Sequence, residues 1–198
     1  PASMRPTPAL RAALLTFLCV VAAACASTSR PVPGPAPALA LPPVTTVYLV
    51  RHAERAPGQG DVAISELGQA RARALRDSLV GRGVAGTIVS QWRRTAETAQ
   101  PLAEATGLTV SARPLDMFDV TGSARTMAQA IAAEFAGRTV LVVGHSNTIP
   151  AMIAALTGTE RSDLNDRDYD GLYRVRIVDG QATVTRIRYG ADDGVPDL

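Results

Sequence analysis

From residue 45 onward, short apolar runs alternate with segments that repeat apolar residues at helical spacing. The apolar runs have the length and β-branched content of buried strands and lie at residues 45–50, 86–89, 108–111 and 139–143. The segments between them predict a helix that Ser65 caps and Gly81 ends, followed by helices at 93–106, 123–136 and 149–156. This alternation is typical of a parallel sheet with helices on its faces.

The end of the chain has a different pattern. Residues 173–178 and 182–187 alternate polar and apolar side chains on either side of Asp179-Gly180, which predicts a hairpin with a primed turn. The fold class expected for residues 44–198 is therefore α/β. We expect one domain, a three-layer α/β/α sandwich with a mostly parallel central sheet and an antiparallel edge hairpin.

The first 25 residues are typical of a targeting segment. Met4 is the expected start, since Pro1 cannot be an ordinary initiator. Residues 12–24 form an apolar stretch that is too short for a comfortable membrane span. Its last three residues are alanines before Cys25, which resembles a bacterial lipobox with Cys25 as the lipidated residue. The alternative is a plain secretory signal that is cut at an Ala-x-Ala site.

Residues 26–43 are rich in Ser and Thr and then in Pro and Ala, which predicts an extended linker. The predicted organisation is thus a signal peptide at 1–25, a linker at 26–43 and a domain at 44–198. We expect an exported protein, a periplasmic or cell-envelope lipoprotein of a bacterium, attached to the membrane through its lipid.

Composition excludes several kinds of chemistry. The formal net charge of +2 gives no case for a nucleic-acid partner, and all 20 basic residues are arginine, which excludes Schiff-base and P-loop lysines. Cys19 and Cys25 both precede the domain, so we expect no disulfide and no thiolate metal site in the folded part.

The candidate chemistry lies where the predicted strands end. Arg51 and His52 follow the first apolar run, Arg94 begins the helix after the second, and His145 follows the fourth. Carboxyl ends of parallel strands share one edge of a sheet, so these four side chains should converge. Two arginine forks suit phosphate oxygens, and two histidines without thiolates are too few for a structural zinc site. One histidine as nucleophile and the other as donor to phosphoryl oxygens is the simplest interpretation, with no metal and no cofactor.

Three motifs carry a family resemblance. They are Arg51-His52-Ala53-Glu54, the pattern formed by Ser90, Arg94, Thr98 and Ala99, and Gly144-His145-Ser146. In this order they resemble the histidine phosphatase superfamily, which has the phosphoglycerate-mutase-like fold, over residues 44–160. The resemblance implies that His52 is the nucleophile that becomes phosphohistidine. It also implies that Arg51, Arg94 and His145 complete the phosphate pocket of a metal-independent phosphatase.

The departures from the family narrow this interpretation. Ser146 follows His145 at the position where the acid phosphatase branch of the family has an aspartate after its second histidine. The chain also lacks the insertions that mutases carry. We expect a compact phosphatase acting on a phosphorylated small molecule or a phosphoprotein, nearest in build to small phosphohistidine phosphatases. A phosphoglycerate-type mutase and a non-catalytic phosphate-binding module remain as alternatives. Neither the particular substrate nor the oligomeric state can be predicted.

The glutamate that usually serves as acid in the mutases and many small phosphatases is missing. Glu54, Asp116 and Asp119 are the candidates to replace it. Glu54 ranks first, because alternation along a continuing strand would place it on the same side as His52. Beside the arginines it should stay ionised, which suits a base better than an acid, so we expect a dependence on good leaving groups. We also expect a neutral His52 and a charged His145, with pKa values pushed apart.

Overall fold

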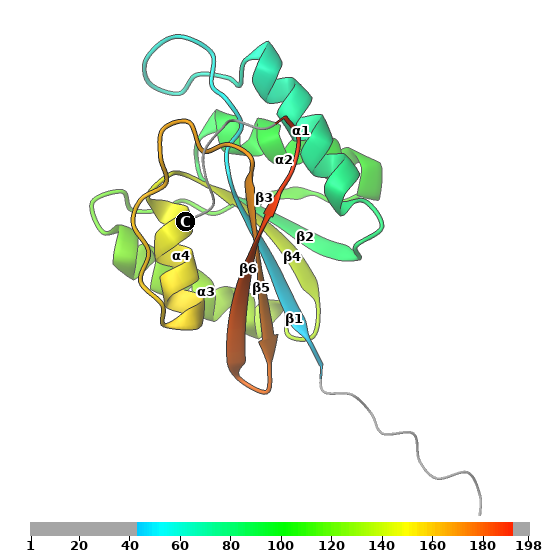
Figure 1. Ribbon diagram of the computed structural model, residues 1–198, viewed down its shortest axis with the longest axis vertical. Helices are drawn as coiled ribbons and strands as arrows, with labels where there is room; N and C mark the ends of the chain where they lie inside the picture. The colour runs from blue at the N-terminus through cyan, green and yellow to red at the C-terminus, as the bar shows by residue number, and fades with distance from the viewer. Residues whose placement is uncertain (1–42, 192–198) are drawn as a thin grey trace, which may run out of the picture. The chain divides into compact units, whose positions relative to one another are not determined.

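The computed structural model describes residues 43–191, which form one six-stranded sheet with four helices (Figure 1). The strands are β1 (Thr45–Arg51), β2 (Val84–Val89), β3 (Val110–Ala112), β4 (Thr139–Gly144), β5 (Gly171–Val178) and β6 (Gln181–Arg188). The helices are α1 (Glu66–Leu79), α2 (Arg93–Thr106), α3 (Val120–Glu134) and α4 (Thr148–Thr157). The predicted signal peptide, its Cys25 and the linker lie outside the described residues.

The strand order is β3-β2-β4-β1-β5-β6. β1 pairs in parallel with β4, which pairs in parallel with β2, and β3 extends this parallel part. On its other side β1 pairs with β5 in the antiparallel sense, and β6 completes the hairpin. The predicted fold class, mostly parallel with an antiparallel edge hairpin, is confirmed.

Helices cover both faces of the sheet. Alternate residues of β1 belong to different cores, because successive strand side chains point to opposite faces. Tyr48 and Val50 pack with α1 and α2, whereas Val47 and Leu49 pack with α3 and α4. β1 is therefore buried on both faces, which explains why its sequence is an almost continuous apolar run.

Several element boundaries differ from the predicted ones, and two of these differences have a clear local cause. β3 begins at Val110 rather than at residue 108, because the Leu108 N–H still donates to the Ala103 carbonyl at the end of α2. α3 begins at Val120 rather than at residue 123. Its N-cap is Asp119, whose carboxylate accepts the Gly122 N–H at 2.9 Å. A candidate acid is thus a helix-capping residue.

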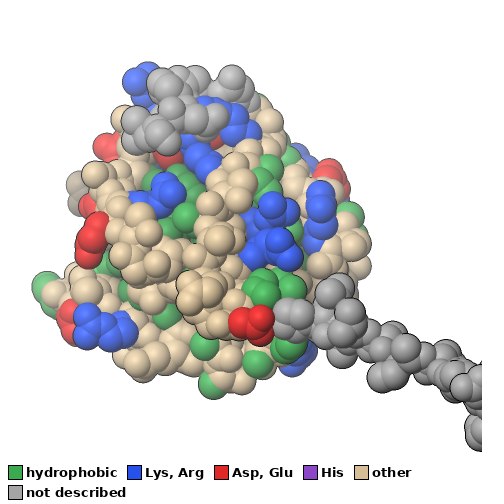
Figure 2. All heavy atoms as spheres, turned by 60° about the horizontal axis from the view of Figure 1, so that its bottom comes forward, with side chains coloured by type: hydrophobic (Ala, Val, Ile, Leu, Met, Phe, Trp, Pro, Cys, Tyr) green, Lys and Arg blue, Asp and Glu red, His purple; other side chains and the backbone are tan. Residues whose placement is uncertain are grey.

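The hairpin has the turn that its sequence predicts. Asp179 and Gly180 have φ values of 49° and 75°, as a type I′ turn requires at both central positions. Figure 2 views the molecule with the lower end of Figure 1 brought forward, and arginine side chains gather in several groups on this face. Among residues 43–191, no helix is both long enough and apolar enough to cross a membrane.

Candidate active site

The four predicted phosphate-site residues meet at one edge of the sheet. They line a pocket of about 580 Å³ at the carboxyl ends of β1, β4 and β2, which are neighbours in the sheet. The backbone N–H of His52 donates to the Gly144 carbonyl at 2.9 Å, which ties the end of β1 to the end of β4. We call this hollow, which contains Arg51, His52, Arg94 and His145, the phosphate pocket.

His52 is held in one tautomer by its own backbone. Its Nδ1 lies 2.8 Å from the Ala53 carbonyl oxygen, which can only accept, so Nδ1 carries the proton and Nε2 has its lone pair available. The Ala53 N–H in turn donates to Thr98 Oγ1 at 2.9 Å, and that hydroxyl donates to the Arg94 carbonyl. Thr98 thus links the backbone beside His52 to the first turn of α2.

His145 has the opposite tautomer. Its Nδ1 lies 3.4 Å from Arg94 Nη2, and a guanidinium only donates, so Nδ1 accepts and the proton is on Nε2. Nε2 donates to Ser90 Oγ at 2.9 Å. Ser90 Oγ lies 3.1 Å from Thr95 Oγ1, which donates to the Trp92 carbonyl. The motif residue Ser90 therefore fixes the orientation of the second imidazole.

Burial lowers the pKa of both histidines. The pKa of His52 falls to about 4, chiefly through loss of solvent and further through the positive charges of Arg51 and Arg94. The pKa of His145 falls to about 3 through loss of solvent, then through His52 and the same arginines. The prediction of a charged His145 with a divergent pKa is wrong for this structure, because both rings share one buried cationic environment.

Backbone carbonyls and aromatic rings hold the two arginines of the pocket in place. Arg51 Nη1 donates to the carbonyls of Asn165 and Asp166, and its guanidinium lies 4.2 Å from the centre of the Tyr169 ring. The guanidinium group of Arg94 lies over the ring of Trp92 in a cation–π contact.

Three guanidinium nitrogens in this group are buried without a hydrogen-bond partner among the described residues. They are Nε of Arg51 and both Nε and Nη1 of Arg94. Buried unpaired donors are costly, so donors of this kind commonly serve a ligand with acceptor oxygens. Loss of solvent also lowers the pKa of Arg94 below its usual value.

The structure does not bring Glu54 into the phosphate pocket. β1 ends at Arg51, so the alternation that would place Glu54 beside His52 does not continue. The Glu54 carboxylate instead binds Arg71 of α1 at 2.7 Å, with both side chains almost fully buried. Glu54 also accepts the Ser65 N–H with its carbonyl, against which Gly68 of α1 packs too closely for any Cβ.

Asp116 and Asp119 also lie outside the phosphate pocket. Asp116 is exposed and accepts the Phe118 N–H, and Asp119 caps α3. None of the three carboxylates considered from the sequence therefore lines the pocket that holds His52.

The sequence motifs do not include one wall of this pocket. That wall comes from the segment between α4 and β5 and contributes Asp163, Asp166 and Tyr169. It is anchored by the buried Asp170, which binds Arg186 and Arg188 of β6. Topology is the signal that could have predicted it. Because β5 runs antiparallel to β1, the start of β5 lies at the edge where β1 ends.

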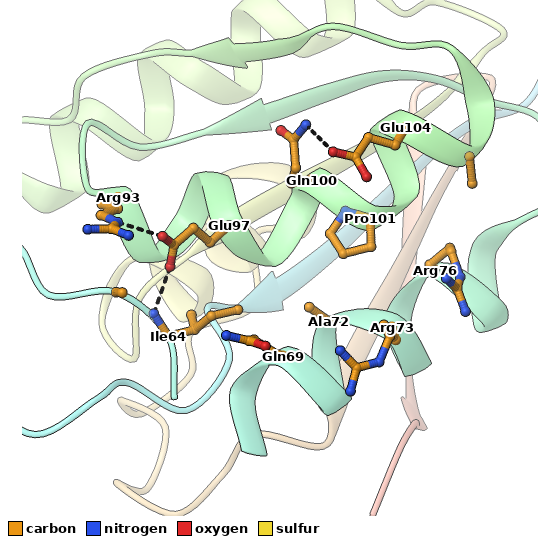
Figure 3. Close-up of a pocket in the computed structure, with 12 residues that line it drawn as sticks. Ile64, Gln69, Ala72, Arg73, Arg76, Arg93, Glu97, Gln100, Pro101 and Glu104 are labelled. Atoms are coloured by element: carbon orange, nitrogen blue, oxygen red, sulfur yellow. Dashed lines mark hydrogen bonds and ion pairs between the residues drawn. The ribbon is translucent and has the colours of Figure 1, made fainter. Parts of the chain in front are cut away.

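A larger hollow of about 720 Å³ lies between α1 and α2 and contains neither histidine. Figure 3 shows that charged and polar groups on this surface pair with each other, including Arg93 with Glu97 and Gln100 with Glu104. Among residues 43–191, no group of three or more His, Cys, Asp or Glu side chains is arranged to hold a metal ion.

Comparison with known proteins agrees with the fold and the motifs. The family model of the histidine phosphatase superfamily (branch 1) matches residues 47–115, which include Arg51, His52 and Arg94. Residues 47–115 are therefore similar to this family. No curated protein matches the chain.

Several solved structures share the fold at low sequence identity. The mycobacterial glucosyl-3-phosphoglycerate phosphatase has a TM-score of 0.58 at 17% identity, with 74% of this chain and 100% of that chain covered. The protein histidine phosphatase SixA has a TM-score of 0.58 at 20% identity, with 72% and 96% covered. A phosphoserine phosphatase from Entamoeba histolytica has a TM-score of 0.57 at 15% identity, with 71% and 95% covered.

Proposed function

We propose that this domain is a metal-independent phosphatase that hydrolyses phosphomonoesters or phosphohistidine through a phosphohistidine intermediate on His52. One observation carries the proposal. His52, whose Nε2 is unprotonated, lines a pocket together with Arg51 and Arg94, and these arginines have three buried N–H donors without a partner among residues 43–191. A phosphoryl group has both the electrophilic phosphorus for the nucleophile and the oxygens for these donors.

In the first step His52 Nε2 attacks phosphorus in line with the leaving oxygen. The N–P bond forms while the P–O bond to the leaving group breaks, and the electron pair of that bond goes to the leaving oxygen. Charge spreads over the three remaining phosphoryl oxygens, and the guanidinium groups neutralise it. The low pKa of His52, about 4, keeps the nucleophile neutral near pH 7.

In the second step water attacks the phosphohistidine. The new P–O bond forms and the N–P bond breaks, which releases inorganic phosphate and returns His52 to its starting tautomer. His145 faces His52 with a ring-centre distance of 5.3 Å. The low pKa of His145, about 3, keeps this ring neutral near pH 7, and its Nδ1 accepts from Arg94 Nη2, which orients that guanidinium group for the phosphoryl oxygens.

The three neighbours described above are phosphatases whose names or ligands point to different substrates. Glucosyl-3-phosphoglycerate and protein phosphohistidine are named for two of them, and the E. histolytica enzyme is in complex with phosphoserine. Their variety supports phosphoryl transfer as the shared chemistry rather than any one substrate.

The test is turnover by the full chain and by His52→Ala in the presence of EDTA. Wild type should hydrolyse 4-nitrophenyl phosphate, and His52→Ala should lose several orders of magnitude in kcat because the nucleophile is removed. Denaturation in alkali during turnover, which preserves the acid-labile N–P bond, should trap a phosphohistidine in wild type alone. Full activity of His52→Ala, or complete loss of wild-type activity in EDTA, would exclude the proposed chemistry.

We also propose that the protein is exported and anchored through lipid on Cys25. The apolar segment that ends in alanines before this cysteine supports the proposal.

A further inference from the structure

A second hollow adjoins the phosphate pocket. It has a volume of about 620 Å³, lies between α3 and α4, and shares Asn147 and Asp163 with the phosphate pocket. Its lining includes Pro150, Ala151, Ala154 and Ala155 of α4, with Arg125 of α3 and Arg161 beside them. We call it the α3–α4 groove. A substrate with its phosphoryl group in the phosphate pocket therefore has room for the rest of the molecule in the adjoining groove.

Asp163 lies at the junction of these two hollows. The exposed side chain of Asp163 lines both the phosphate pocket and the α3–α4 groove. Hydrogen bonds hold the backbone of the two residues that follow it. The Leu164 N–H donates at 2.9 Å to the carbonyl of Ser146, the residue that follows His145. The Asn165 carbonyl accepts from Arg51 at 2.9 Å. The segment that carries Asp163 is thus tied to the ends of both β4 and β1.

The proposed reaction requires a proton donor when the leaving group is an alkoxide. Glu54 is paired with Arg71, and Asp116 and Asp119 bind backbone N–H groups at the start of α3. Two other carboxylates, Asp163 and Asp166, line the phosphate pocket. Asp166 lines only the phosphate pocket, whereas Asp163 lines both this pocket and the groove. The bond between the phosphoryl group and the leaving group would lie at their junction, beside Asp163.

We propose that Asp163 is the general acid and base of this phosphatase and that the α3–α4 groove holds the leaving group. The substrate class is then phosphomonoesters of alcohols, in place of the dependence on good leaving groups expected from the sequence. This inference rests on the proposed function of His52.

The proton balance is as follows. As His52 Nε2 bonds to phosphorus and the P–O bond breaks, the Asp163 carboxyl proton goes to the leaving oxygen and an alcohol departs. The Asp163 carboxylate then takes a proton from the attacking water, whose oxygen bonds to phosphorus as the N–P bond breaks. Inorganic phosphate leaves, and Asp163 is again protonated.

The experiment measures kcat/KM of the full chain for a series of aryl and alkyl phosphates of increasing leaving-group pKa. Wild type should show a shallow dependence. Asp163→Asn should lose about 10²- to 10⁴-fold for alkyl phosphates and much less for 4-nitrophenyl phosphate, so that the dependence becomes steep. Asp163→Glu keeps a carboxyl group and should restore part of the alkyl phosphate activity.

Two further variants locate the effect. Asp179→Asn removes a carboxylate in the distant β5–β6 turn, where asparagine suits the positive φ, and should keep the wild-type dependence. Asp166→Asn tests the other carboxylate of the pocket, and a steep dependence there instead of in Asp163→Asn would overturn the assignment. Ala155→Trp narrows the groove from an exposed position of α4 and should raise KM for a bulky alkyl phosphate more than for methyl phosphate. Equal KM changes would overturn the groove as leaving-group site.

The outcomes for Asp163 and for His52 can be told apart. A wild type whose turnover depends on His52, combined with the same leaving-group dependence in Asp163→Asn, would overturn the role of Asp163 and leave the proposed function standing. A wild type without turnover on any of these esters would overturn both.

Discussion

The imidazole rings of His52 and His145 lie 5.3 Å apart at an angle of 62° and carry their protons on opposite nitrogens. The Nδ1–H of His52 and the Nε2–H of His145 are both used within the protein. The Nε2 of His52 therefore remains unprotonated, and the pair can act as nucleophile and hydrogen-bond partner without exchanging a proton first.

This buried pair should make the protein sensitive to acid. Both folded pKa values, about 4 for His52 and about 3 for His145, lie below the ordinary histidine pKa of 6.5. Below pH 6.5 the unfolded state binds more protons, so stability is fully present above pH 6.5 and is lost as the pH falls through the folded values. Between pH 7 and 5 the loss should be on the order of 2 kcal/mol per histidine.

Urea unfolding at several pH values checks this expectation. His145→Gln should flatten the pH dependence of the unfolding free energy relative to wild type over pH 5–7. The same slope in wild type and in this variant would show that His145 does not titrate with a lowered pKa.

Replacing Arg94 with lysine should weaken oxyanion binding. Lysine keeps the charge but loses the planar fork, and it cannot supply both Nε and Nη1 donors. We expect tungstate affinity to fall by about tenfold or more, since a charged hydrogen bond contributes about 1.5–3 kcal/mol. Isothermal titration calorimetry measures this loss.

Arg93→Lys is the matched control. Arg93 is adjacent in the sequence but is exposed and pairs with Glu97 on the surface of α2. Its replacement should leave tungstate affinity within twofold, because exposed ion pairs contribute little. A similar loss in both variants would indicate a general charge effect rather than a fork at Arg94.

Glu54→Gln should affect stability more than catalysis. The Glu54–Arg71 pair is buried, and removal of one partner leaves an uncompensated charge, at a cost of about 3 kcal/mol. Chemical denaturation should show this loss, while kcat per folded molecule should stay within a fewfold of wild type. A large loss of kcat at unchanged stability would instead return Glu54 to the list of catalytic candidates.

Lipidation predicts the behaviour of Cys25→Ala. Wild type should partition into detergent after expression in a Gram-negative host, because the several acyl chains of a lipoprotein anchor a protein stably. Cys25→Ala should partition into the aqueous phase. Release of both proteins into the aqueous phase would indicate a plain secretory signal.

The architecture was predictable because its signals are local. Strands such as β1 are nearly continuous apolar runs, and Ser65 and Gly107 act at helix ends through their immediate neighbours. The convergence of Arg51, His52, Arg94 and His145 on one pocket was predictable for the same reason. Each of these residues ends a strand, directly follows one or opens the helix after it, and parallel strands bring these positions together.

The rest of the site depends on information that short motifs lack. The placement of Glu54 depends on where β1 stops, and the binding of Arg71 to the carbonyls of Tyr189 and Ala191 involves residues more than 100 positions away. Asp163 and Tyr169 reach the pocket only because β5 reverses direction beside β1. The neutral state of His145 follows from burial, which no spacing of residues in the sequence reveals.

The antiparallel direction of β5 also means that the pocket is built from two separate parts of the chain. Residues 47–115, which match the family model, carry His52 and both arginines, whereas the wall from Asp163 to Tyr169 lies beyond that match. The buried Asp170, held by Arg186 and Arg188, secures this wall at its base independently of the histidines. Under the proposed role of Asp163, selectivity for the alcohol portion of a substrate would change through residues 158–167 while His52 and the two arginines stay the same, which makes this segment the place to redesign what the protein accepts.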